Sequence, residues 1–164
     1  MSYRREARVS ENTWILVADR SKAMIFEAIW PDMEYYRKIH EFENPTGFAR
    51  SEDTIRDRPG RLAGAGMMRS IGEPPTNYRH RSAQEMALAI IEHLEQGRTN
   101  HQFGRLIVIA PALLLGVLRD RMPTPLSKTV VLTLRKHLVD VRIRELMEQV
   151  NDGLAMNRDQ VLVS

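Results

Sequence analysis

The chain has 164 residues, of which 43% are hydrophobic and 27% are charged. Both fractions lie near the averages of globular proteins, which excludes wholesale disorder and a fibrous architecture, and the length suits one domain. The formal net charge of +3 produces only a weak overall field,. A nucleic-acid partner would therefore have to be recognised by a local basic segment.

The sequence contains no cysteine. This excludes disulfides, thiolate catalysis and cysteine-based zinc or iron–sulfur sites, and it fits a reducing compartment. The arginines near the N-terminus are followed by no apolar run of the kind that an export signal needs. The longest apolar stretch, residues 106–118, is interrupted by Pro111 and Gly116 and is shorter than the roughly 20 residues that cross a bilayer,. We therefore expect a cytoplasmic protein without membrane insertion.

The first third of the chain has the pattern of a strand meander. Residues 14–18 and 23–28 are short apolar runs rich in β-forming residues, and the polar turn 19–22 separates them,. Residues 35–42 follow a Pro-Asp turn and predict a third, more exposed strand,. The three strands are expected to pair in sequence order.

Helices and strands alternate in the second half. Ser82 and Glu85 form a capping box that predicts the start of a helix, and Gly97 predicts its end,. The continuous apolar run 106–110 is typical of a strand covered on both faces. Pro111 then predicts the start of a second helix.

The second helix is expected to end before Pro123, and residues 129–134 predict another strand,. Asp140 can cap a last helix, which Gly153 is expected to end,. Strands that alternate with helices normally pair in parallel. The predicted fold is therefore α/β, with a layered mixed β-sheet that combines an N-terminal strand meander with an α-β-α-β-α continuation.

These elements predict a simple domain organisation. Residues 1–12 are expected to be a flexible N-terminus, residues 13–153 one α/β domain, and residues 154–164 a C-terminal tail,. Residues 47–80 lack helical or strand periodicity and predict a long loop rich in arginine and glycine,. A loop of this length within a domain usually indicates function or disorder.

Seven arginines and four acidic residues lie between positions 50 and 81. Guanidinium groups bind phosphate in a bidentate manner, and a backbone rich in glycine and proline adapts to it. The alternative is a solvated loop without a specific partner. The candidate nucleic-acid-binding residues are Arg56, Arg58, Arg61, Arg69, Arg79 and Arg81, and the candidate loop motif consists of Pro59, Gly60, Gly64 and Gly66.

Catalytic and cofactor motifs are missing from the sequence. The five histidines lie in five separate segments without the spacing of a metal site, and no serine-hydrolase or nucleotide-binding glycine motif occurs,. Asp19 is interpreted as a turn residue, because a metal-dependent nuclease would need further acids near it. The helix start after Pro111 has no cation beside it in the sequence. We therefore predict no catalytic residue, no metal and no cofactor.

Several segments together resemble a known family. They are Trp14-Ile15-Leu16-Val17-Ala18-Asp19 with Ala23-Met24-Ile25-Phe26, then Asp57-Arg58-Pro59-Gly60-Arg61, then residues 103–111 with Leu115-Gly116. In this order and spacing they are similar to the bacterial host-attachment protein family, which is grouped with bacterial relatives of the archaeal and eukaryotic release factors. The resemblance implies a fold like the middle domain of those factors, with a long loop near their glycine motif.

The sequence also departs from this pattern. In the comparable loop it has Gly64-Ala65-Gly66-Met67 and no glutamine between Phe48 and Tyr78, so the hydrolytic activity of release factors is not implied. It has Ala112-Leu113 where the family is expected to have Pro-Arg. We expect a non-enzymatic binding module that contacts RNA or the ribosome through the arginine-rich loop. The alternatives are an attachment-linked protein that acts through protein partners and a metal-dependent hydrolase or nuclease.

Overall fold

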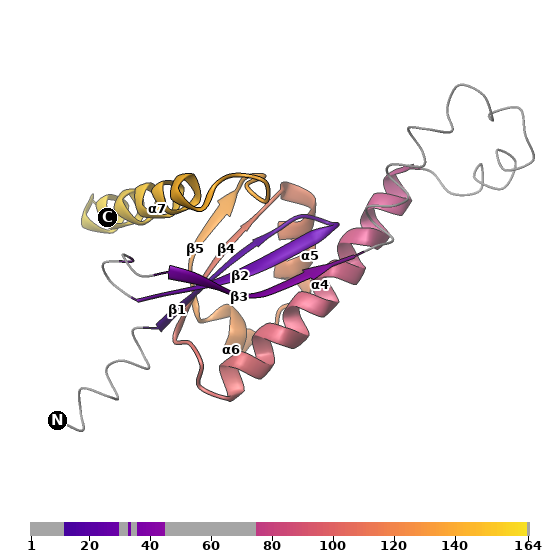
Figure 1. Ribbon diagram of the computed structural model, residues 1–164, viewed down its shortest axis with the longest axis horizontal. Helices are drawn as coiled ribbons and strands as arrows, with labels where there is room; N and C mark the ends of the chain where they lie inside the picture. Colours follow the sequence, from indigo (N-terminus) through magenta and orange to yellow (C-terminus); the bar gives the residue numbers. More distant parts are fainter. Residues whose placement is uncertain (1–11, 30–32, 34–35, 45–74, 164) are drawn as a thin grey trace, which may run out of the picture.

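A mixed β-sheet with helices on both faces forms the centre of the computed structural model, which describes residues 12–29, 33, 36–44 and 75–163 (Figure 1). The five strands lie in the order β3-β2-β1-β4-β5. Their bounds are Asn12–Ala18 for β1, Lys22–Ile29 for β2, Tyr36–Glu43 for β3, Arg105–Ala110 for β4 and Val130–Arg135 for β5. The helices are α4 (Pro75–Thr99), α5 (Ala112–Arg121), α6 (Thr124–Ser127) and α7 (Ile143–Val163).

The pairing of the strands confirms the predicted meander and the predicted mixed sheet. β2 pairs with β1 and with β3 in antiparallel fashion, whereas β4 pairs in parallel with β1 and with β5. The parallel pairs follow from the helices that intervene in the sequence, because each parallel connection needs a crossover. β3 and β5 are the two edge strands of the sheet.

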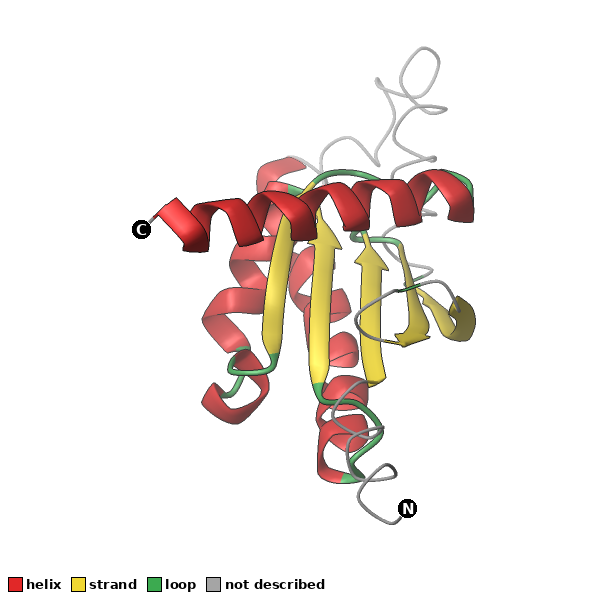
Figure 2. Cartoon of the chain, turned by 90° about the vertical axis from the view of Figure 1, so that its left-hand side faces the viewer, coloured by secondary structure: helices red, strands yellow, loops and turns green. Residues whose placement is uncertain are grey.

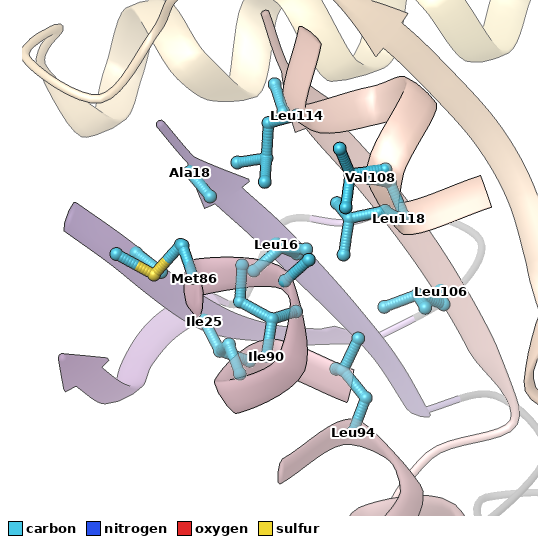
Figure 3. Close-up of a cluster of buried hydrophobic side chains, with 14 of the residues drawn as sticks. Leu16, Ala18, Ile25, Met86, Ile90, Leu94, Leu106, Val108, Leu114 and Leu118 are labelled. Atoms are coloured by element: carbon cyan, nitrogen blue, oxygen red, sulfur yellow. The ribbon is translucent and has the colours of Figure 1, made fainter. Parts of the chain in front are cut away.

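Side chains that alternate along β1 supply two separate apolar cores. Leu16 is fully buried among side chains of α4 and α5, as Figure 3 shows, and Ile15 and Val17 are fully buried on the opposite face, against α7. Alternation with a period of two sends neighbouring residues of a strand to opposite faces. Figure 2 shows α7 running across the sheet on the face opposite to the other helices.

The first helix begins earlier than predicted. α4 starts at Pro75, so the predicted capping box is wrong: Ser82 is only 1% exposed and lies inside the helix. The prediction of a loop over 47–80 is therefore wrong from Pro75 onward, and residues 47–74 lie outside the described part of the chain. Proline is favourable at the first position of a helix. The residues from 77 to 81 show no apolar periodicity because they are mostly exposed and do not face the sheet.

Both glycines that were predicted to end helices lie inside them. α4 continues past Gly97 to Thr99, and α7 continues past Gly153 to Val163, so most of the predicted C-terminal tail is helical. Both positions are glycine because a neighbouring side chain packs closely against the helix there. A Cβ atom on Gly97 would lie 2.4 Å from the Trp14 ring, and one on Gly153 would lie 3.0 Å from Leu132.

Two further details were not predicted correctly. Asp140 lies in a turn before α7 and not at the first residue of that helix. The short helix α6 was not predicted, although Pro125 fits its first turn,.

In the C-terminal half of α7, the side-chain amide of Asn157 donates a hydrogen bond of 3.3 Å to the backbone carbonyl of Val131 in β5. Among the described helices, none has the length and apolar character that crossing a membrane would require.

We predict that Gly97→Ala lowers the free energy of unfolding by about 2 kcal/mol, because the added methyl group must displace the Trp14 ring within a packed core,. Urea denaturation would measure the change.

Gly116→Ala is the matched control for this prediction. Gly116 also lies within a helix, but a Cβ atom there would meet nothing within 4 Å. Alanine is the better helix former, so Gly116→Ala should raise the free energy of unfolding by about 0.5–1 kcal/mol. Equal stability of the Gly97→Ala protein and the unsubstituted protein would contradict the packing role of Gly97.

Candidate functional site

The predicted arginine site lies only partly within the described residues. Arg79 and Arg81 are both exposed, and they lie in helix α4 rather than in the predicted loop. The predicted residues that lie outside the described part of the chain are Arg56, Arg58, Arg61, Arg69, Pro59, Gly60, Gly64 and Gly66.

The start of α4 extends beyond the sheet as a basic arm, which we define as residues 77–81. With 25 residues, the helix is roughly 37 Å long, whereas an eight-residue strand is roughly 26 Å long,. Figure 1 shows its N-terminal end reaching past the strands. The first turn of α4 has no acidic residue, and residues 77–81 are exposed or partly exposed, whereas Ser82, which follows them, is buried. Arg79, His80 and Arg81 are thus presented to solvent together.

A second polar group forms where β1 ends. The Oδ1 atom of Asp19 accepts hydrogen bonds of 2.8 Å from the backbone N–H of Ser21, the backbone N–H of Lys22 and the Ser21 hydroxyl. Its Oδ2 atom lies 3.1 Å from Nε2 of His137, which follows β5. The bonds to Ser21 and Lys22 close the β1–β2 turn, which agrees with the interpretation of Asp19 as a turn residue. The contact with His137 joins distant segments and could not be read from local sequence.

The environment of Asp19 favours its charged form. Burial raises the pKa of the carboxyl, but the hydrogen bonds from Ser21, Lys22 and His137 outweigh it, and the net pKa is lowered,. Ser21 and His137 contact different oxygens of one carboxylate, so the group does not have the serine–histidine contact of a catalytic triad,. Within the described segments, no three His, Cys, Asp or Glu side chains cluster in a way that could hold a metal ion.

Asp19→Ala should lower the free energy of unfolding by about 1–3 kcal/mol, because two backbone N–H groups of the turn lose their acceptor,. His137→Gln should change it by less than about 0.5 kcal/mol, since that side chain is 55% exposed,. Thermal and urea unfolding of both variants would measure the difference. A larger effect of His137→Gln than of Asp19→Ala would show that the contact with His137, and not the turn, carries the stability.

A stack of rings surrounds His93 on the inner side of α4. Its imidazole lies against His40 of β3 with ring centroids 4.0 Å apart, and against Trp14 of β1 at 5.8 Å. Trp14 in turn stacks on Phe103 at 4.6 Å. His93 is partly buried, and it makes these ring contacts with described residues. Burial first, and the neighbouring His40 second, lower the pKa of His93.

Stability is expected to fall as the pH decreases below about 6.5, the ordinary histidine value. Because the pKa of His93 is lowered in the folded state, the unfolded chain takes up the proton first, and the stabilisation present above that pH is lost,. His93→Gln removes this proton uptake, so the free energy of unfolding should decrease less between about pH 7.5 and pH 5.5 than in the unsubstituted protein. Urea denaturation at the two pH values would measure it. His80→Gln, at an exposed position of the same helix, should leave the loss unchanged; equal pH dependence of all three proteins would rule out His93 as its source.

Comparison with known proteins identifies the family. Residues 14–150 match the family described as "Protein required for attachment to host cells". The chain belongs to this family, as its sequence segments predicted. No curated protein matches the sequence significantly.

Among solved structures, the chain is similar to the archaeal translation termination factor aRF1, with 13% sequence identity and a TM-score of 0.42. The similarity covers 93% of this chain and 41% of that factor, so the chain spans less than half of its length.

Proposed function

We propose that this host-attachment family protein is a non-enzymatic, cytoplasmic binding module that contacts RNA, on the ribosome or free, through the arginines between positions 50 and 81. The observation that carries the proposal is the basic arm of α4. Arg79 and Arg81 end the run of arginines between positions 50 and 81, and both are exposed on α4, whose N-terminal end reaches past the strands (Figure 1).

The electrostatics of the arm favour an anionic partner. The positive end of the helix dipole acts within the first turn of α4, which has no acidic residue, so it adds to the positive potential that an anionic partner would meet there,. The guanidinium groups of Arg79 and Arg81 follow this turn directly and would contact a phosphate backbone,. Arg79 and Arg81 are two positions apart and point to different sides of the helix, which suits an arm that enters a groove or is wrapped by a flexible strand.

Arg79→Ala/Arg81→Ala should weaken binding to a fluorescein-labelled 20-nucleotide oligouridine, and it should reduce the salt slope of log K by about 1.4, the value for two phosphate contacts on a single strand. Replacing Arg58, Arg61 and Arg69 with alanine should leave the fold intact and weaken the same binding. Fluorescence anisotropy over a salt series would measure both, and cosedimentation with ribosomal particles would test the larger partner.

Arg142→Ala/Arg144→Ala is the matched control, because it removes two exposed arginines near the start of α7, outside the 50–81 arginine series. This variant should keep the salt slope of the unsubstituted protein. If the unsubstituted protein does not bind the oligonucleotide at low salt, the proposal fails.

The family description favours a second candidate function, namely attachment to host cells through protein partners. A tagged protein recovered from its own host distinguishes the two functions. Ribosomal proteins and RNA would dominate the recovered material if the module contacts the ribosome. Envelope proteins would dominate it if the protein acts in attachment.

A further inference from the structure

A cleft opens between helix α5 and the edge strand β5. Its volume is about 620 Å³, and it extends from Ala112 at the start of α5 to Met122 at its end, which is roughly 15 Å of helix,. The cleft exists because β5 is the last strand of the sheet. On this face the side chain of Thr133 is exposed, whereas Val108 of the neighbouring strand β4 is buried.

The floor of the cleft is apolar. Leu118 is buried within it, and Leu115, Met122 and Val130 pack on the core cluster while they remain partly exposed. The fold thus leaves aliphatic side chains in contact with water along the cleft. Covering them would be favourable at about 25 cal/mol per Å² of apolar surface.

Two arginines flank this apolar floor. Arg119 of α5 and Arg135 of β5 both line the cleft, and both are exposed. In the part of the chain that the structure describes, neither guanidinium pairs with a carboxylate. Arg135 lines the same cleft as Ala112, the first residue of α5. The fold therefore supplies a cation on the side of α5 where the adjacent sequence has none. Ser127 and Thr133 add hydroxyl groups.

We propose that this cleft binds a small amphiphilic anion, with its apolar body on the floor between α5 and β5 and its carboxylate or phosphate group against Arg119 and Arg135. Volumes of roughly 300–1,000 Å³, with an apolar lining and a few convergent polar groups, are typical of small-molecule sites. A pair of guanidinium groups with no carboxylate partner among the described residues favours an anionic head group. The aliphatic floor without an aromatic ring selects an aliphatic body rather than a nucleobase,.

Titration of the ¹⁵N-labelled full chain with sodium decanoate, followed by amide chemical shifts, tests the proposal. Saturable shifts are expected for amides of α5 and β5. Acetate, which has the head group without the body, and AMP, whose body is polar, should shift these amides far less. Arg119→Ala/Arg135→Ala should raise the Kd for decanoate roughly tenfold or more, since each removes a charged hydrogen-bonding group. Thr133→Trp places a large ring in the cleft at an exposed strand position and should abolish saturable binding,.

Arg121→Ala/Arg144→Ala is the control, because neither residue lines the cleft; this variant should bind decanoate as the unsubstituted protein does. The dispersion of the amide spectrum of each variant reports whether it is folded. The proposal is overturned if decanoate causes no saturable shift, if both arginine variants bind alike, or if AMP binds as tightly as decanoate. It is also overturned if the cleft amides shift with protein concentration alone, because the occupant is then a second copy of the chain.

Discussion

The burial of β1 from both sides is the interaction on which the rest of the structure depends. Ile15, Leu16 and Val17 are fully buried, and their side chains alternate between the core beneath α4 and α5 and the core beneath α7. The same strand pairs in antiparallel fashion with β2 and in parallel with β4, so it joins the meander to the helix-linked half of the sheet. A polar residue at any of these three positions would be costly to bury without a hydrogen bond. The position of every surface discussed above follows from this strand.

The basic arm and the cleft both lie where a helix and the sheet cover different lengths or widths. α4 is longer than the strands that it covers, and its first turns reach beyond them as a basic arm. α5 leaves part of β5 uncovered, and a cleft with two arginines results. The arm lies outside the cores, whereas the floor of the cleft is the outer side of the core beneath α4 and α5. The two surfaces differ in chemistry: the arm has charge without an apolar floor, whereas the cleft has both, so a polyanion suits the first and a compact amphiphile suits the second.

Local sequence was sufficient for the strands and insufficient for the helix ends. The runs 14–18 and 106–110 consist of consecutive apolar and β-branched residues, which predict buried strands,. The alternation of strands with helices predicted that these strands pair in parallel,. Gly97 is adjacent in space to Trp14, which is 83 positions away in the sequence, so its packing role had no local signal. The same holds for the ring contact of His40 with His93 and for the lining of one cleft by both Arg119 and Arg135. The arginines at 79 and 81 were recognised from charge, but their helical context was not, because apolar periodicity is weak where a helix has no core to face,.

The two edges of the sheet differ in how they resist pairing with another chain. β3 has charges along its length, and Arg37, Lys38, Glu41 and Glu43 make its edge a poor template for a further strand,. β5 has the composition Val-Val-Leu-Thr-Leu-Arg, with a single charge at its end. The side-chain amide of Asn157 in α7 donates a hydrogen bond to the backbone carbonyl of Val131 in this strand. The length of α7 past Gly153 therefore fastens the helix to the less charged of the two edge strands, which is the one that an added strand would pair with more readily,.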